Sequence, residues 1–245
     1  EGIEVIIFDD SEKDLLVASE INFYKKNGLD INYKKNKFPK GACFNWNLLL
    51  STARGKYKWL LHHDEYPVNT SELIKTIFEL IQKRKTKIFI LPIKVKKRLF
   101  QRICLIKKIN PPIYFIRKFI ARPELLFFSN VFGPPSVMIV DSELCYRFDQ
   151  RYIQLIDIEA YYSLFNKLSI NEISFINSSK FSLESEIIDG SITSKIRKKI
   201  KLLHQEESKI FFAEHKIRFP SFIWILFTKI IYRIYKIINL RIKFV

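Results

Sequence analysis

The stretch "ACFNWNLLLSTARGKYKWLLHHDE", residues 42–65, places a helix pattern, a strand pattern and a polar cluster in direct succession. Apolar side chains recur with the i, i+3, i+4 and i+7 spacing of an α-helix, at Trp46, Leu49, Leu50 and Ala53. Gly55 is expected to close that helix, because glycine readily adopts the left-handed conformation of a helix C-terminus. The next run, residues 57–63, predicts a strand, and two acids follow it at positions 64 and 65.

The same alternation of strand and helix patterns continues on both sides of this stretch. Strand patterns cover residues 3–10, 30–35, 57–63 and 87–93, and helix patterns cover residues 11–26, 44–55 and 69–85. Ser11 and Asn69 are expected to be the N-caps of the first and third helices. Such alternation predicts an α/β fold with a mostly parallel central sheet flanked by helices. Ligands of such sheets bind beyond the carboxyl ends of the strands, where the acidic pairs at 9–10 and 64–65 both fall.

Composition limits the partners and the compartment. The 245 residues carry 42 basic and 25 acidic side chains, a net charge of +17, which favours a phosphorylated metabolite, nucleic acid or a membrane surface as partner. Cys43, Cys104 and Cys145 are far apart and match no zinc or redox spacing, which fits a reducing cytoplasm. Because the sequence starts at Glu1 and its sole methionine is Met138, we expect an N-terminal piece to be missing.

The most skewed charge lies between Lys83 and Arg122, where the chain has many basic residues, no acid and no clean periodicity. Three interpretations stay open: a solvated face, a surface for membrane or acceptor phosphate, and a nucleic-acid surface. No RNA- or DNA-binding motif accompanies the charge, so nucleic acid is not expected as a partner.

Residues 206–245 are expected to form a tail that is separate from a catalytic domain at residues 1–205. The uncharged run at 219–228 is well short of the ~20 residues that span a bilayer. Beyond it, basic residues share one face of a predicted amphipathic helix: Lys229, Arg233 and Lys236. A helix with these basic and aromatic residues typically lies in the interface of an anionic membrane. This pattern predicts a cytoplasmic protein attached peripherally to the inner face of the cell membrane.

Three segments, taken in order, resemble the family 2 glycosyltransferases with the GT-A nucleotide-sugar-binding fold. Residues 4–14, "EVIIFDDSEKD", are similar to their first acidic motif. Residues 41–65 resemble their Asn-x-x-x-x-x-Ala-x-Gly segment, which leads into the strand with the metal-binding acids. Residues 130–162 are similar to the acceptor-side segment, in which an aromatic–Asp pair precedes the helix with the catalytic base. Order and spacing agree over roughly residues 1–165.

The resemblance implies a GT-A Rossmann-like domain with a C-terminal amphipathic helical tail. It also implies transfer of a sugar, with inversion, from a nucleotide donor that we expect to be UDP-linked. The acceptor would be a saccharide or a lipid-linked saccharide in bacterial surface-polysaccharide synthesis. Two features depart from the family: the strand and helix that normally precede residue 4 are absent, and the usual Asp-x-Asp or Asp-Asp motif is replaced by His62-His63-Asp64-Glu65.

The resemblance implies that Asp64 contacts the donor and, with Glu65 in second place, binds Mg²⁺ or Mn²⁺. Hard oxygen ligands suit these ions, which stabilise the charge that grows on a diphosphate leaving group. A solvated loop acid is the alternative for Asp64. For His62 and His63 we favour local packing and hydrogen bonding, since histidine clusters prefer Zn²⁺ and no further zinc ligands are evident.

By the same resemblance Asp157 is the catalytic base, which takes the proton of the acceptor hydroxyl as that hydroxyl attacks opposite the diphosphate. A simple helix cap is the alternative for Asp157, and Glu159 is expected to point elsewhere on the same helix. Asp9 and Asp10 are expected to contact the nucleotide base or ribose, or else to cap the following helix.

Asn45 and Asn47 lie where the family has its asparagine, and their amides would bridge backbone and nucleotide or play a buried structural role. Gly133 and Ser136 would shape the acceptor pocket, or form only a structural turn. The rival hypothesis for the whole chain is a non-catalytic or truncated relative that binds nucleotide or membrane.

Overall fold

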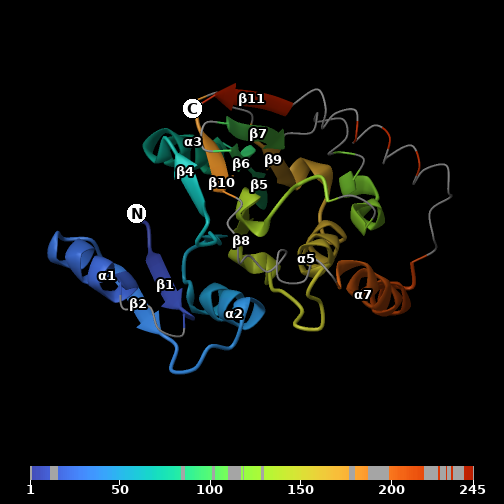
Figure 1. Cartoon of the computed structure of the whole chain (residues 1–245), viewed down its shortest axis with the longest axis horizontal. Coiled ribbons are helices and arrows are strands. Elements are labelled where there is room, and N and C mark those ends of the chain that lie inside the picture. The colour runs from blue at the N-terminus through green and yellow to red at the C-terminus, as the bar shows by residue number, and fades with distance from the viewer. Residues whose placement is uncertain are drawn as a thin grey trace.

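The computed structural model describes residues 2–11, 16–83, 86–100, 103–109, 117, 119–127, 130–176, 180–186, 199–217, 226, 230, 233 and 240–244. The helices and strands in these ranges (Figure 1) are, in chain order, β1 (Val5–Asp9), α1 (Leu16–Lys26), β2 (Ile31–Lys35), α2 (Ala42–Thr52), β3 (Tyr57–Trp59), β4 (Glu65–Val68), α3 (Thr70–Lys83), β5 (Ile88–Ile90), β6 (Ile93–Phe100), β7 (Ile103–Ile109), β8 (Met138–Asp141), α5 (Ile156–Phe165), β9 (Ile173–Phe175), β10 (Ser182–Glu186), α7 (Ile200–His215) and β11 (Leu240–Phe244). Short 3-10 turns cover Pro123–Phe127, Pro135–Val137, Ser142–Leu144 and Ile170–Glu172.

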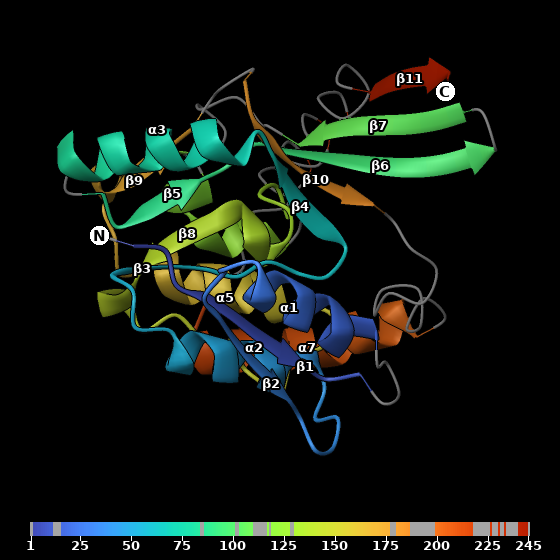
Figure 2. The same cartoon turned by 90° about the vertical axis from the view of Figure 1, so that its left-hand side faces the viewer.

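The strands form three sheets. β1 and β2 pair in parallel, with Val5 opposite Ile31. A four-stranded sheet has the order β3-β8-β5-β9, and a five-stranded sheet has the order β11-β7-β6-β10-β4. Figure 2 shows α3 on one side of the four-stranded sheet and α5 on the other. The α/β class is therefore confirmed, as helices cover both faces of this sheet.

The expectation of a mostly parallel sheet was wrong. Among the described strands, β1–β2, β5–β9 and β6–β10 are parallel pairs. The other pairs, β3–β8, β5–β8, β4–β10, β6–β7 and β7–β11, are antiparallel. The cause is the strand β8, which comes from later in the chain and inserts between β3 and β5, running against both. Local alternation of strand and helix patterns carries no information about such an insertion.

Helix boundaries differ from the expected ones where tertiary contacts decide them. α2 ends at Thr52, and the N–H of Ala53 closes its last turn on the carbonyl of Leu49 at 3.0 Å, so Gly55 does not close it. α3 begins at Thr70 after Asn69, whose φ is 56° and whose side chain donates to the carbonyl of Lys180 instead of capping the helix. The expected Ser11 cap concerns residues 12–15, which lie outside the described ranges.

The basic segment contains a long hairpin that its sequence did not predict. β6 and β7 pair in antiparallel register from Ile93 opposite Ile109 to Phe100 opposite Ile103. On β6, the Nζ of Lys94 lies 3.9 Å from the Oε1 of Glu184, and Lys96 pairs with the same carboxylate. β11 adds to β7 as an antiparallel strand, so the C-terminal end of the expected helical tail is a strand.

The main hydrophobic core includes a residue of α7 that lies after position 205, in the segment expected to form the tail. α7 crosses that boundary, and its Phe211 is fully buried in the main hydrophobic cluster. In the rest of the expected tail, Leu226, Ile230 and Arg233 are helical and exposed, whereas Lys229 and Lys236 lie outside the described residues. None of the helices in the described ranges combines the length and the apolar character that crossing a bilayer requires.

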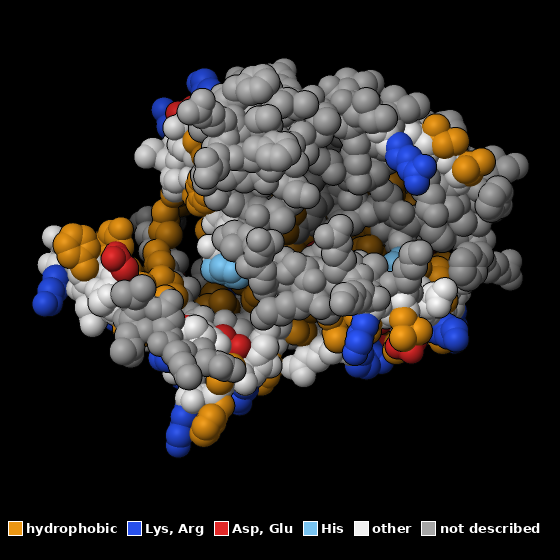
Figure 3. All heavy atoms as spheres, in the orientation of Figure 1, with side chains coloured by type: hydrophobic (Ala, Val, Ile, Leu, Met, Phe, Trp, Pro, Cys, Tyr) orange, Lys and Arg blue, Asp and Glu red, His pale blue; other side chains and the backbone are white. Residues whose placement is uncertain are grey.

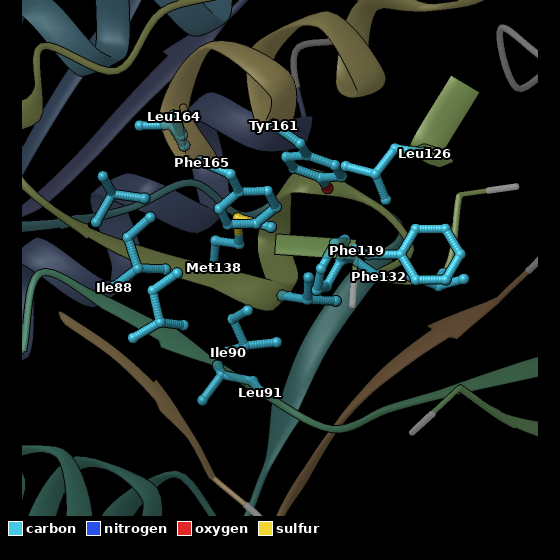
Figure 4. Close-up of a cluster of buried hydrophobic side chains, with 14 of the residues drawn as sticks. Ile88, Ile90, Leu91, Phe119, Leu126, Phe132, Met138, Tyr161, Leu164 and Phe165 are labelled. Atoms are coloured by element: carbon cyan, nitrogen blue, oxygen red, sulfur yellow. The ribbon is translucent and has the colours of Figure 1, made fainter. Parts of the chain in front are cut away.

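The main core holds the four-stranded sheet against α5 (Figure 4). Ile88 and Ile90 of β5 and Met138 of β8 face Tyr161 and Phe165 of α5, and all five side chains are buried. Because α5 carries Asp157, this packing fixes the helix on which the predicted base lies. The sheet also carries β3, whose continuation leads to His62 and the two acids.

Candidate active site

The predicted metal-binding acids form a cluster that also includes a histidine. Ligand atoms of His62, Asp64 and Glu65 all lie within 4.8 Å of one another. Glu65 is the first residue of β4 and is buried, while His62 and Asp64 are half-buried in the turn between β3 and β4. Within the described part of the chain, this is the group of three or more such side chains close enough to hold a metal ion. His63 is exposed on the same turn.

His62 packs locally, as expected, and also presents a ring nitrogen to the site. Its ring stacks on that of Trp46 with 4.5 Å between centroids, and its Nδ1 lies 3.5 Å from the Oε2 of Glu65. Its Nε2 is buried and has no hydrogen-bond partner. Burial lowers the pKa of His62 to about 4, despite the opposing charge of Asp64, so the ring is neutral near pH 7. A neutral imidazole has a lone pair free for a metal ion.

Glu65 lies in a desolvated environment beside the same histidine. Burial raises the pKa of Glu65 to about 7, although the backbone N–H of His62 donates to its Oε2 at 3.2 Å and favours the charged form. The hydroxyl of Ser136 is close enough to favour the charged form as well, yet it makes no hydrogen bond of ordinary geometry. The site therefore holds a carboxylate whose charge is poorly compensated by the protein.

Asp157 faces this cluster from α5. It lies in the first turn of the helix, and its carboxyl group is desolvated even though part of the residue is exposed. Burial, together with repulsion from Glu65, raises the pKa of Asp157 to about 7. The fold thus brings the predicted base and the predicted metal-binding acids together from distant parts of the sequence. In the space-filling view, a histidine side chain borders a hollow between the β1–α1–β2 unit and the body of the molecule (Figure 3).

Glu159 points away from this site. The hydroxyl of Ser163 donates to its Oε1 at 2.7 Å, and the Nε2 of His215 lies 4.0 Å from the same oxygen. Burial raises the pKa of Glu159. Asp157 and Glu159 therefore occupy separate environments on one helix.

The Gly-Pro-Pro-Ser turn, residues 133–136, is hydrogen-bonded to two of the elements that position the site. Gly133 has a φ of 100°, which favours glycine, and its carbonyl accepts a 2.9 Å hydrogen bond from the hydroxyl of Tyr161 on α5. The carbonyl of Ser136, which is fully buried, accepts a 2.7 Å bond from the indole of Trp59 on β3. Both predicted acceptor-side residues therefore lie in a turn that is hydrogen-bonded to β3 and to α5.

Asp9 and Asp10 end β1 and have different partners. The carboxylate of Asp9 is buried and accepts bonds from the backbone and hydroxyl of Ser11, from Tyr33 and from Lys35. Burial alone would raise the pKa of Asp9, but these hydrogen bonds outweigh it and lower the pKa. Asp10 accepts from the backbone N–H groups of Lys40 and Gly41, directly before α2.

The two asparagines of α2 hold backbone in place. Asn45 donates to the carbonyl of Phe8 at 2.9 Å and accepts a bond from the Asn36 amide, which also reaches Asp10. Asn47 makes two bonds to Phe148, donating to its carbonyl at 2.7 Å and accepting from its N–H at 2.8 Å. These are the buried structural contacts that the sequence left open as an alternative.

Two aromatic side chains near the site were not among the predicted residues. Trp46 stacks on His62 and meets Phe148 edge-on at 5.1 Å. The hydroxyl of Tyr146 is buried without a hydrogen-bond partner, and burial together with the charge of Asp157 raises the pKa of Tyr146 well above 10. The helical pattern marks Trp46 only as apolar, although its place between two asparagines at the motif is a usable signal.

Comparison with known proteins identifies a family whose model matches this sequence. Residues 1–140 match the family model described as "Glycosyl transferase family 2". That match includes the metal-candidate cluster and ends within β8, before Asp157. No curated protein matches the sequence significantly.

Solved structures similar to the chain include crystal structures of S. aureus TarS. The 1–349 fragment aligns with a TM-score of 0.53 and 16% identity, over 75% of this chain and 51% of that chain. A longer TarS structure aligns with a TM-score of 0.52 and 14% identity, over 81% of this chain and 33% of that chain. The 1–349 fragment in complex with UDP aligns with a TM-score of 0.49 and 17% identity. The chain thus spans about half the length of the TarS fragment. At these identities the likeness shows the fold.

Proposed function

The chain belongs to glycosyl transferase family 2 and has the GT-A fold, and from this premise we propose the reaction it catalyses. It transfers a sugar from a UDP-linked donor to a saccharide or lipid-linked acceptor, with inversion at the anomeric carbon. The pathway is the synthesis of a bacterial surface polysaccharide. The observation that supports this proposal is the repulsion between the desolvated Asp157 and Glu65, which belongs to the His62–Asp64–Glu65 cluster.

The residues at 62–65 fit a divalent cation, for which we propose Mg²⁺ or Mn²⁺. Two carboxylates and a neutral imidazole offer ligand atoms within 4.8 Å of one another, and the Nε2 of His62 has no protein partner. Carboxylate oxygens suit both ions, and imidazole is also a common ligand of first-row metals such as Mn²⁺. Such an ion stabilises the charge that develops on the diphosphate leaving group. Asp64 and Glu65 would hold it, with His62 as the third ligand.

Asp157 acts as the general base in this proposal. Its carboxylate accepts the proton of the acceptor hydroxyl while the hydroxyl oxygen forms the new glycosidic bond and the nucleoside diphosphate leaves from the opposite face. A pKa of about 7 suits this role, because a base works best when its pKa lies near the working pH. A single base is sufficient for inversion, which agrees with the separate environment of Glu159.

The same proposal assigns the contacts to the donor and to the acceptor. Asp9 and Asp10 bind the base or the ribose of the nucleotide from the end of β1. Asn45 and Asn47 support the donor side through the backbone they hold, at Phe8 and Phe148. The turn with Gly133 and Ser136 shapes the acceptor side.

We also propose that the catalytic domain extends through Ile217 and that the segment after it attaches the enzyme to the inner face of the cell membrane. Support comes from Leu226, Ile230 and Arg233, which are helical and exposed and which share one face by their spacing of four and three. Apolar and basic side chains on one exposed face suit an anionic membrane surface.

A donor screen tests the proposed function. Purified protein is incubated with UDP-, GDP- and dTDP-sugars, with and without Mn²⁺, and released nucleoside diphosphate and thermal stabilisation are measured. We expect metal-dependent release from a UDP-sugar, and stabilisation without release for Asp157→Asn. Stabilisation without release by the unmodified protein would favour the non-catalytic alternative. Neither effect with any donor would contradict the proposal.

A further inference from the structure

A buried carboxylate from α7 closes the turn in front of the helix that carries Asp157. Glu207 is only 4% exposed. Its Oε1 accepts hydrogen bonds from the backbone N–H groups of Ile153 at 2.9 Å and Gln154 at 3.2 Å. Its Oε2 accepts from Gln154 at 3.0 Å and from Leu155 at 2.8 Å. One side chain thus binds three consecutive backbone donors.

These contacts hold the turn before α5, from the N-cap residue Leu155 back to Ile153. α5 begins at Ile156 with Leu155 as its N-cap residue, and a leucine side chain offers no acceptor. Consecutive N–H groups form a concave site that favours an anion, and hydrogen bonds to a carboxylate are stronger than those to a neutral group. Glu207 therefore places a negative charge, from a different helix, against the backbone that leads into α5.

α7 is itself held firmly against α5, as the neighbouring ribbons in Figure 1 show. Phe211, one turn after Glu207, is fully buried and contacts Tyr162 of α5 with 5.0 Å between ring centroids. Further along α7, Glu214 accepts a 2.9 Å bond from the guanidinium of Arg151 and a 3.2 Å bond from the hydroxyl of Tyr152. The turn before α5 is thus bound to α7 at two places, of which the Glu207 contact is the buried one.

We propose that Glu207 is a positioning residue for the transfer reaction: by fixing the backbone at 153–155 it sets where the carboxyl group of Asp157 stands relative to the acceptor hydroxyl. This inference rests on the proposed function. Asp157 is two residues beyond the last bound N–H, so a shift of the turn moves the base directly. Displacement of a reacting group by about 1 Å can cost on the order of 10²-fold in rate.

Positioning and mere structural support have different consequences. The proposed donor contacts lie at the end of β1, which bonds to β2, Lys40 and Gly41 rather than to α7. Loss of the Glu207 contact should therefore lower kcat and leave donor affinity unchanged. A purely structural role would lower the melting temperature without this selective loss.

The experiment compares Glu207→Gln with Glu206→Gln, a matched control that removes the same charge from the exposed neighbouring position of α7. Glutamine keeps the shape of Glu207 but turns one acceptor oxygen into a donor that faces backbone N–H groups. The readouts are nucleoside diphosphate release from the UDP-sugar that the unmodified protein turns over fastest, donor Kd, and hydrogen exchange of residues 153–155.

We expect Glu207→Gln to lower kcat roughly 10–100-fold, to keep donor Kd within about twofold, and to speed exchange at 153–155 about tenfold. Glu206→Gln should stay within about twofold of the unmodified protein in all three. In an Asp157→Asn background, adding Glu207→Gln should change the residual rate by less than about twofold, because Glu207 acts through Asp157.

Unchanged kcat or unchanged exchange in Glu207→Gln would overturn the positioning role while leaving the proposed function intact. Full activity of Asp157→Asn, or no turnover by the unmodified protein with any donor, would instead refute the proposed function and the positioning role that rests on it. A parallel loss of donor affinity would also overturn the inference, since it would indicate general structural damage.

Discussion

Asp9 and Asp157 are aspartates in opposite electrostatic settings. Asp9, at the end of β1, is surrounded by donors from Ser11, Tyr33 and Lys35, which lower its pKa in spite of its burial. Asp157, on α5, is desolvated and faces Glu65, and its pKa is raised to about 7. Near pH 7 the Asp9 carboxylate is therefore charged, while that of Asp157 is poised to take up a proton.

The regions that carry Asp9 and Asp157 also differ in how their apolar side chains are packed. The β1–α1–β2 unit exposes large apolar side chains, with Ile3 and Phe23 each 60% exposed. α5, by contrast, buries Tyr161 and Phe165 in the main core. A fixed charge on a loosely packed unit suits ligand binding, which tolerates adjustment. A proton-accepting group on a tightly packed helix suits chemistry, which requires a defined geometry.

The largest expected effect on activity is that of a substitution at Asp157 on α5. Asp157→Asn should lower kcat roughly 10²–10⁴-fold, because it removes the base while keeping the shape of the side chain. Donor binding and the circular dichroism spectrum should be unchanged. Steady-state release of nucleoside diphosphate measures the effect, and normal turnover would refute the assignment of the base.

The next effect concerns the cluster that faces Asp157. Asp64→Ala should lower transfer by about 10²-fold or more, because several kcal/mol of charge stabilisation depend on the metal ligands. The stabilisation of the protein by Mn²⁺ should be lost with it. His63→Ala, a change at the exposed neighbouring position, is the matched control, and an equal loss in both variants would contradict a specific role for Asp64.

A third measurement tests the raised pKa of Asp157 through stability. The pKa of about 7 in the folded protein exceeds the usual aspartate value of 3.8, so the stabilising contribution is complete below about pH 4 and is lost as the pH rises through 7. Asparagine lacks this dependence. In EDTA, Asp157→Asn should therefore be more stable than the unmodified protein by about 2–4 kcal/mol at pH 8 and equally stable at pH 4. Thermal melts of both proteins at the two pH values measure this difference in stability. A difference that stays the same at both pH values would contradict the desolvation of Asp157.

The smallest effect, with the opposite sign, is expected at Asp9. Its lowered pKa means that its contribution to stability is present above the usual value of 3.8 and is lost as the pH falls through the lowered pKa. Asp9→Asn should cost about 1 kcal/mol at pH 7 and less at pH 3. It should also weaken donor binding more than it lowers kcat. Urea unfolding at both pH values, with a titration of donor, measures this, and a pH-independent loss would argue against the charged contacts.

Much of the fold could be predicted from the sequence, because its first part has strong local signals. The patterns around β1, α2 and α3 have clear periodicity, and the acids at 64–65 follow a strand pattern, so these elements and their order could be recognised. The insertion of β8 between β3 and β5 could not, since a strand's neighbours depend on packing far along the chain. The hairpin of β6 and β7 was missed because its basic residues obscure the alternation typical of a strand.

Individual residues of the candidate site could be predicted where a single sequence motif contains them. Glu65 lies beside Asp64 in the cluster and close enough to Asp157 to raise its pKa, and this proximity depends on the fold and not on any local pattern. The contribution of His62 to the cluster needs the stacking partner Trp46, which only the structure shows. Glu207 has no local signal at all, because a glutamate inside an amphipathic helix normally faces solvent.

The pairing of β11 with β7 changes what can be done to the C-terminal segment. Residues 218–239 are joined to the fold at both ends, by α7 on one side and by β11 on the other. A membrane contact made between these two attachments would hold the enzyme at two points of its chain, which restricts its orientation more than a free tether does. Deleting the chain after Ile217 would also uncover the backbone N–H and C=O groups of β7, and an unpaired strand edge invites aggregation. Charge-reversing substitutions between residues 218 and 239 would therefore test the proposed membrane contact more cleanly than a truncation.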